Sequence, residues 1–99
     1  MSKPSTYKIN GVDYTLQGAS PRWVMEQSDK YGVGTPRVDT AGYIDVMLRN
    51  CVINPPAVRQ RGLDFFDEIG DLSTPEKLIA QIERYLREPV QFEKGPGPG

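Results

Sequence analysis

The 99-residue sequence contains no histidine and only one cysteine, Cys51. Without histidine, the chain lacks the commonest general base and the commonest nitrogen ligand of metal ions. A single cysteine can form neither a disulfide within the chain nor a cysteine-based zinc site, and it fits a reducing cytoplasm best. Cys51 lies on the apolar stripe of a predicted helix, so we expect a small core residue there and not a nucleophile. These absences argue against an enzyme and against a metal or other cofactor.

Neither sign of charge is in surplus. Twelve Lys and Arg residues oppose thirteen Asp and Glu residues, which gives a net charge of −1. Binding to nucleic acid or to anionic lipid requires a surplus of positive charge. Arg59 and Arg61 lie close together, but Asp64, Asp67 and Glu68 follow them at once, which predicts a solvated mixed face instead of a phosphate site. We therefore expect no nucleic-acid partner.

Long apolar runs are also missing. No stretch approaches the roughly 20 apolar residues of a membrane helix. The first residues, Met-Ser-Lys-Pro-Ser, are not followed by the apolar segment of a signal peptide. We expect a protein without a membrane partner.

What the sequence does contain begins with a β-hairpin, predicted over residues 6–17. Apolar and polar residues alternate on both sides of Asn10-Gly11. Asn-Gly is the preferred pair for a type I′ turn, because both residues tolerate positive φ angles. A lone hairpin is marginal in water, so its apolar face must pack on other elements.

Two helices follow in the middle of the chain. Ser20-Pro21 predicts a cap followed by proline at the first helical position, and this helix should end near Tyr31. A second helix, capped by Asp39 or Thr40, should run to about residue 52, because its apolar residues recur at three- and four-residue steps. The Asn-Pro-Pro sequence at 54–56 ends it and forces an extended path.

The last third of the chain is less regular. For residues 57–72 we predict a short helix or turn over 62–69 that ends at Gly70. The final helix opens either with Ser73 and Glu76 as a capping box, or with Thr74 as the cap before Pro75. The acidic residues at 64, 67, 68 and 71 are expected to form a solvated surface.

These segments indicate an α+β fold in which an N-terminal β-hairpin packs on a bundle of three to four α-helices. We expect a disordered lead-in over residues 1–5, one globular domain over 6–88, and a flexible tail over 89–99 that is rich in Gly and Pro.

Several segments, taken in order, resemble one family. They read Ile-Asn-Gly-Val-Asp-Tyr-Thr-Leu at 9–16, Pro-Arg-Trp-Val-Met-Glu at 21–26, Tyr-Ile-Asp-Val-Met-Leu at 43–48, Val-Ile-Asn-Pro-Pro at 52–56 and Thr-Pro-Glu-Lys-Leu at 74–78. This layout, over residues 6–88, resembles the tail assembly chaperones of long-tailed bacteriophages and prophages. The resemblance implies a small helical protein of the host cytoplasm that binds the tape measure protein, keeps it soluble and helps to recruit tail tube protein. It supplies no catalytic residues.

Four residues are candidates for binding such a partner: Trp23, Met25, Met47 and Tyr85. Trp23 suits an interface anchor, although a core position beneath the hairpin is favoured. Met25 and Met47 suit an adaptable surface, with core filling as the default for Met47. Tyr85 lies on the stripe of the last helix, part of which a partner could contact.

The alternative function is a structural component of the virion, such as a head–tail joining or tail completion protein. Such proteins form rings through extended surfaces and stay in the particle, whereas the chaperones are typically absent from it.

Overall fold

Strands and helices follow one another in the order ββααβααα in the computed structural model, which describes residues 4–88. The elements are β1 (Ser5–Ile9), β2 (Val12–Leu16), α1 (Pro21–Lys30), α2 (Thr40–Cys51), β3 (Val52–Asn54), α3 (Pro56–Arg61), α4 (Leu63–Ile69) and α5 (Ser73–Arg87). The predicted α+β class with an N-terminal hairpin is confirmed, but residues 4–88 form five helices and not three to four. Ser5, which was expected in the lead-in, belongs to β1, whereas residues 1–3 and the expected tail over 89–99 lie outside the described residues.

The hairpin turns at Asn10-Gly11, as predicted. Both residues have positive φ angles, 51° and 83°, and Ile9 pairs with Val12 across the turn. Alternation along β2 places Tyr14 and Leu16 in the core. The hairpin thus presents one apolar face to the helices.

A third strand extends the sheet, and the sequence pattern did not reveal it. The helix α2 ends at Cys51, and the extended residue Val52 opens β3, which pairs antiparallel with β2. The Gln17 amide also donates a 2.8 Å hydrogen bond to the Cys51 carbonyl. The predicted end of this helix at about residue 52 is thus confirmed to within one residue, and Val52 satisfies its backbone in the sheet. The Asn54–Pro55 peptide bond that follows is cis.

Residues 56–69 form two short helices where the sequence predicted one. Gly62, with a φ angle of +58°, separates α3 from α4. An ideal Cβ at this position would lie 2.3 Å from Asp45 Oδ1 and 2.8 Å from Arg49 Nε, so only glycine allows the approach of α2.

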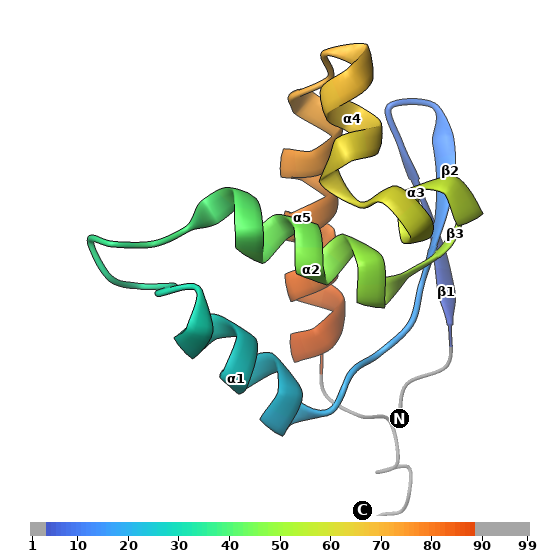
Figure 1. Ribbon diagram of the computed structural model, residues 1–99. Helices are drawn as coiled ribbons and strands as arrows, with labels where there is room; N and C mark the ends of the chain where they lie inside the picture. Colours follow the sequence, from blue (N-terminus) through green and yellow to red (C-terminus); the bar gives the residue numbers. More distant parts are fainter. Residues whose placement is uncertain (1–3, 89–99) are drawn as a thin grey trace, which may run out of the picture.

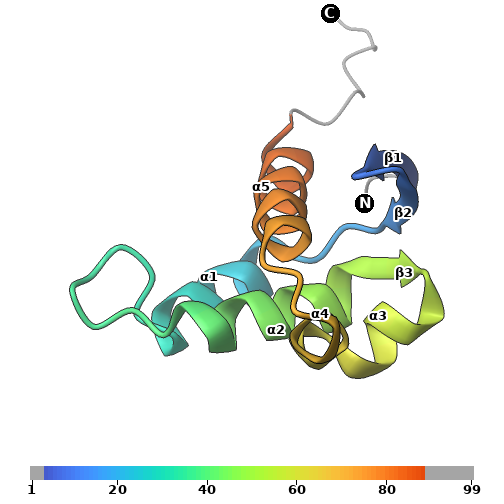
Figure 2. The same ribbon diagram turned by 90° about the horizontal axis from the view of Figure 1, so that it is seen from above.

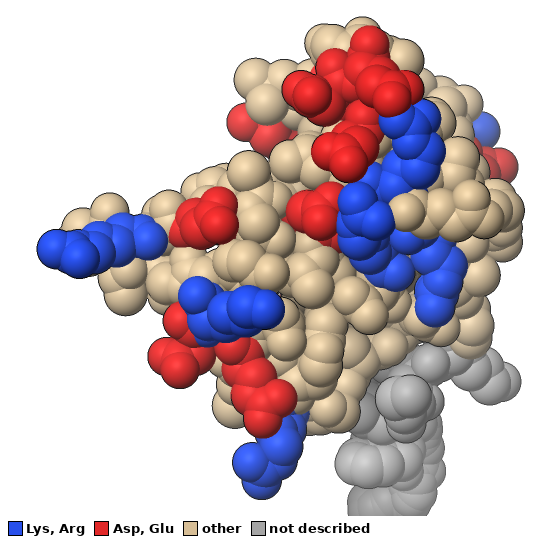
Figure 3. Space-filling view, viewed as in Figure 1, with Lys and Arg blue, Asp and Glu red and all other residues tan. Residues whose placement is uncertain are grey.

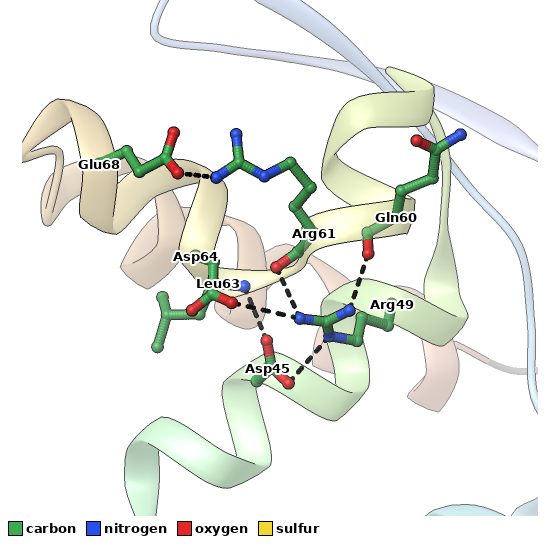
Figure 4. A network of polar contacts seen from close by, with 7 residues as sticks. All are labelled: Asp45, Arg49, Gln60, Arg61, Leu63, Asp64 and Glu68. Carbon is green, nitrogen blue, oxygen red and sulfur yellow. Dashed lines mark hydrogen bonds and ion pairs between the residues drawn. The ribbon is translucent and has the colours of Figure 1, made fainter.

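Side chains from α2 satisfy the backbone at this break (Figure 4). Arg49 donates to the carbonyl oxygens of Gln60 and Arg61 at 2.7 and 2.8 Å, and Asp45 accepts from the Leu63 amide at 2.9 Å. An ion pair of 3.0 Å joins Arg49 to Asp45. The end of α3 and the start of α4, whose orphan backbone groups need partners, are thus both held by α2.

Figure 3 shows acidic side chains over α4 beside basic side chains over α3. Two exposed ion pairs lie in this region, Arg61 with Glu68 and Arg49 with Asp64. The Arg61 guanidinium, by its hydrogen bond, lowers the pKa of Glu68. Two acidic and two basic side chains are thus paired with one another here.

The Asp71 side chain caps the first turn of α5. Its carboxylate accepts from the Thr74 amide at 3.0 Å and from the Thr74 hydroxyl at 2.6 Å, and these bonds lower the pKa of Asp71. The helix begins at Ser73 without a side-chain bond from the residue before it. Both predicted registers, the Ser73–Glu76 box and the Thr74 cap, are therefore wrong: the oxygen comes from Asp71, which was expected to be merely solvated.

The core lies where α5 and α2 meet the sheet. In Figures 1 and 2, α5 lies between the hairpin and α1, and α5 contacts β1, α2 and α4. The residues with no exposed surface include Leu16, Met47, Leu48, Cys51, Val52, Val58, Leu78 and Ile82. Within residues 4–88, no helix has the length and apolar character required to cross a membrane.

Candidate binding groove between α1 and α5

The helix α1 has a well-formed start but almost no share in the core. Ser20 is extended, with φ −67° and ψ 144°, and its Oγ accepts from the Trp23 amide at 3.1 Å. Pro21 occupies the first helical position, as predicted. None of the ten residues of α1 is buried. A helix of this length is marginal in isolation, so contacts at its ends must hold it.

The main attachment lies at the end of α1. The Tyr31 ring packs over Gly42 of α2, where an ideal Cβ would lie 2.6 Å from Tyr31 Cε1. The Tyr31 carbonyl accepts from the Asp39 amide at 2.8 Å, which closes the projecting loop between α1 and α2. Trp23 is half-buried and packs against the edge of the core. The helix is thus anchored by two aromatic side chains.

A groove of about 480 Å³ runs between α1 and the last turn of α5. Its lining residues are Ala19, Pro21, Val24, Met25, Ser28, Asp29, Val33, Leu86 and Arg87. In Figure 1, α1 lies in the lower part, and α5 runs down from α4 until its last turn reaches the level of α1. Six of the nine lining residues are apolar, so the groove offers apolar surface with charge only at its edges.

Met25 forms a ridge between this groove and a second hollow. The second hollow, about 640 Å³, lies against α1 and is lined by Arg22, Met25, Glu26 and Asp29. The Met25 side chain is 70% exposed, so a large apolar group stands in solvent. Its thioether is flexible and adapts to irregular apolar partners.

A polar contact lies beside the groove, between α2 and α5. The Tyr43 hydroxyl donates a 3.0 Å hydrogen bond to Glu83 Oε2. Burial, followed by this bond to Glu83, raises the pKa of Tyr43, so its hydroxyl stays protonated at neutral pH. Glu83 does not line the groove, so Arg87 is the charged residue on its α5 side.

The groove offers a mainly apolar surface. Its lining contains no thiol and no pair of carboxylates. Across residues 4–88, no group of three or more His, Cys, Asp or Glu residues could hold a metal ion. Cys51 is fully buried elsewhere in the core, and burial raises its pKa to about 11. The groove is suited to an apolar segment of another protein.

The four candidate residues have different surroundings. Met25 is exposed in the groove, whereas Trp23, on the same helix, packs against the edge of the core. Met47 and Tyr85, by contrast, are 0% and 4% exposed. Tyr85 meets the Tyr7 ring edge-on, with ring centroids 6.2 Å apart. The expectation that Met47 and Tyr85 offer surface to a partner is therefore corrected: their helices turn these side chains into the core.

Sequence reasoning missed the other walls of the groove, above all Val24, Leu86 and Arg87. One signal was present. Residues 23–25 are three consecutive apolar residues, and successive positions on a helix are about 100° apart, so they cannot all face one core. The position of α5 opposite this helix was not readable, because it depends on packing between segments some 60 residues apart.

A second apolar surface lies at the opposite end of the molecule. Ile69 and Leu72 are 64% and 71% exposed, and Leu72 borders a hollow of about 320 Å³ beside Phe66 and Pro75. This surface is smaller than the groove and sits on the turn between α4 and α5. It provides a matched reference for substitutions in the groove.

Comparison of the chain with protein-family models, with curated proteins and with solved structures gave no match. The chemistry of the groove, together with the layout of the sequence, is therefore what indicates a function.

Proposed function

We propose that this chain is a tail assembly chaperone of a long-tailed bacteriophage or prophage. In this role it binds the tape measure protein in the host cytoplasm, keeps it soluble, and assists the recruitment of tail tube protein. The proposed function is non-enzymatic. The contact surface is the groove between α1 and α5, and the apolar stripe of a tape measure helix occupies it.

The observation that carries this proposal is an exposed methionine on α1 in a groove with mainly apolar walls. All ten residues of α1 escape full burial, and Met25 stands 70% exposed in a groove with mainly apolar walls. An amphipathic helix binds such a groove through apolar residues spaced one turn apart. Burial of the Met25 side chain by a partner would contribute about 1.5–3 kcal/mol at most.

The openness of the site suits a chaperone that must release its partner. The groove is shallow enough that one of its walls, Met25, is mostly solvated. The tape measure protein implied by the resemblance is long and helical, with apolar stripes that stay exposed until assembly. A groove that covers one stripe segment at a time would bind it with moderate affinity.

The direct test is co-expression with the tape measure protein of the same phage. Wild-type chain should increase the soluble fraction of that protein, and Met25→Lys should lose most of this effect, because a charge would enter the groove. The matched control is Leu72→Lys, since Leu72 is 71% exposed but lies at the other end of the molecule. If the tape measure protein is equally insoluble with and without the wild-type chain, the proposal is wrong.

The alternative, a head–tail joining or tail completion protein, makes a different prediction. Mass spectrometry of purified virions should find the chain absent or at trace level if it is a chaperone. Abundant copies in the particle would overturn the chaperone assignment and favour the structural one.

A further inference from the structure

We infer that the charged edges of the groove select an amphipathic helix with unlike flanks: Lys or Arg on the flank facing α1, and Asp or Glu on the flank facing α5. This inference rests on the proposed use of the groove, and it specifies the chemistry of the partner segment and the direction in which it lies.

The α1 edge is acidic near the end of that helix. Asp29 lines both the groove and the neighbouring hollow, and Glu26 lines that hollow one turn earlier. Arg22 also borders the hollow, but it precedes Asp29 by seven residues, or about 10 Å along the axis. Lys30 is turned aside, with its Nζ 5.4 Å from the centre of the Tyr31 ring. The edge facing the groove is therefore negative at Asp29.

The α5 edge is basic. Arg87 lines the groove, and Glu83, one turn before it, accepts the Tyr43 hydrogen bond. Within residues 4–88, neither Asp29 nor Arg87 forms an ion pair, whereas other exposed charges such as Lys8 and Asp13 do. Among the described residues, both edge charges are thus without an ion-pair partner.

Unlike edges also fix a direction. A helix that lies with its apolar stripe in the groove can be reversed end to end, and this reversal exchanges its left and right flanks. Only one of the two directions sets its basic flank against Asp29 and its acidic flank against Arg87. Charge pairing at the edges discriminates between these orientations more than it adds affinity.

The test uses three synthetic helices of about 18 residues, long enough to be partly helical in water. They share one apolar stripe and carry Lys on one flank and Glu on the other, Lys on both, or Glu on both. Their affinities for the full chain are measured by fluorescence anisotropy. The mixed peptide should bind about two- to fivefold more tightly than the others, which is the range for exposed ion pairs.

Substitutions at the edges should then redirect the preference. Asp29→Lys makes both edges basic and should favour the peptide with Glu on both flanks. Arg87→Glu makes both edges acidic and should favour the peptide with Lys on both flanks. These preferences should shrink at about 1 M salt, where the Debye length is about 3 Å.

Two control variants separate edge charge from net charge. Arg84→Glu changes the net charge and the last turn of α5 as Arg87→Glu does, but Arg84 does not line the groove. Asp67→Lys changes the net charge as Asp29→Lys does, but Asp67 lies on the distant α4. Neither control should alter the order of the three peptides.

Two failures are distinguishable. If Met25→Lys abolishes binding of all three peptides but the wild-type chain binds them equally, the groove is used and the inference about its edges is wrong. If Met25→Lys leaves peptide binding unchanged, the groove is not the contact surface, and the proposed site of chaperone action is overturned as well.

Discussion

Asn10 in the hairpin turn donates a 2.9 Å hydrogen bond from its side-chain amide to the Thr74 hydroxyl in the first turn of α5. The Thr74 hydroxyl in turn donates to Asp71 at 2.6 Å, and Lys77 donates to Asn10 Oδ1 at 2.8 Å. Residues 64 positions apart are thereby joined through one amide group. The tip of the hairpin is fixed to the start of the last helix by this cluster.

Replacement of Asn10 should measure the strength of that joint. Asn10→Ala removes the hydrogen bonds and also places a residue less tolerant of positive φ at 51°, so we expect a loss of about 1–3 kcal/mol in the free energy of unfolding. Asn10→Gly tolerates the positive φ angle, so its loss in the free energy of unfolding should be smaller. Urea denaturation measures both. Equal stability of the two variants and the wild type would show that the cluster contributes nothing.

The Asp71 carboxylate should make stability depend on pH in a defined direction. Its hydrogen bonds to Thr74 lower its folded pKa below the ordinary value of 3.8. The folded state therefore binds this proton less tightly than the unfolded chain does, so the stabilisation is present above about pH 4 and is lost as the pH falls through the lower folded pKa.

In thermal melts, wild-type chain should exceed Asp71→Asn in stability at pH 7, and the difference should narrow as the pH falls below 3.8. The control Asp67→Asn removes an exposed carboxylate that accepts no hydrogen bond within residues 4–88. A difference between wild type and Asp71→Asn that stays constant down to pH 2 would contradict the capping role.

Gly42→Ala should destabilise the protein, although glycine in a helix interior usually costs about 0.5–1 kcal/mol relative to alanine. The added Cβ would lie 2.6 Å from both the Tyr31 ring and Asp39 Oδ2, which forces the ring and the capping carboxylate away from this turn of α2. We expect a net loss of about 1–3 kcal/mol and a change in Trp23 fluorescence as α1 shifts. In a Tyr31→Ala background, the same substitution should cost much less. Additive losses would exclude this contact as the cause.

The two methionines that sequence reasoning grouped together should behave differently. Met47 has no exposed surface, so Met47→Ala should lower the free energy of unfolding by about 2–5 kcal/mol. Met25 is 70% exposed, so Met25→Ala should change it by about 0.5 kcal/mol or less. Urea denaturation of both variants measures the contrast. Similar losses would place Met25 in the core.

Cys51 should resist thiol reagents in the folded protein. It is fully buried, and burial raises its pKa to about 11, so little thiolate forms at pH 8 and none of it is accessible. Labelling should be about 10³-fold slower or more than in denaturant, since it requires unfolding. A Met25→Cys variant supplies the comparison, because the new thiol should be exposed and should react rapidly with the reagent. Rapid labelling of Cys51 in native buffer would contradict its burial.

Local sequence signals predicted the elements that depend on neighbouring residues. The hairpin follows from Asn10-Gly11, the start of α1 from Ser20-Pro21, and the apolar face of α2 from its three- and four-residue spacing. The break of α4 at Gly70, which has a φ angle of +68°, was predicted for the same reason. These features were readable because each is decided within a few residues.

The features that escaped prediction depend on distant partners. The strand β3 forms because Val52 pairs with Leu16, 36 residues earlier. The division of α3 from α4 requires Asp45 and Arg49 to bind the backbone on either side of Gly62. In the candidate site, only Met25 was foreseen correctly as surface, because the opposite wall comes from α5. Spacing along the chain carries no signal for any of these contacts.

The attachment of α1 has a consequence for the range of helices that the groove could accept. Because α1 buries none of its residues fully and is attached through the half-buried Trp23 and through Tyr31, a change in its distance from α5 would uncover none of the fully buried side chains. The width of the groove is thereby uncoupled from the integrity of the core. We therefore expect that segments of different girth along a single long partner can be accommodated by adjustment of α1 alone.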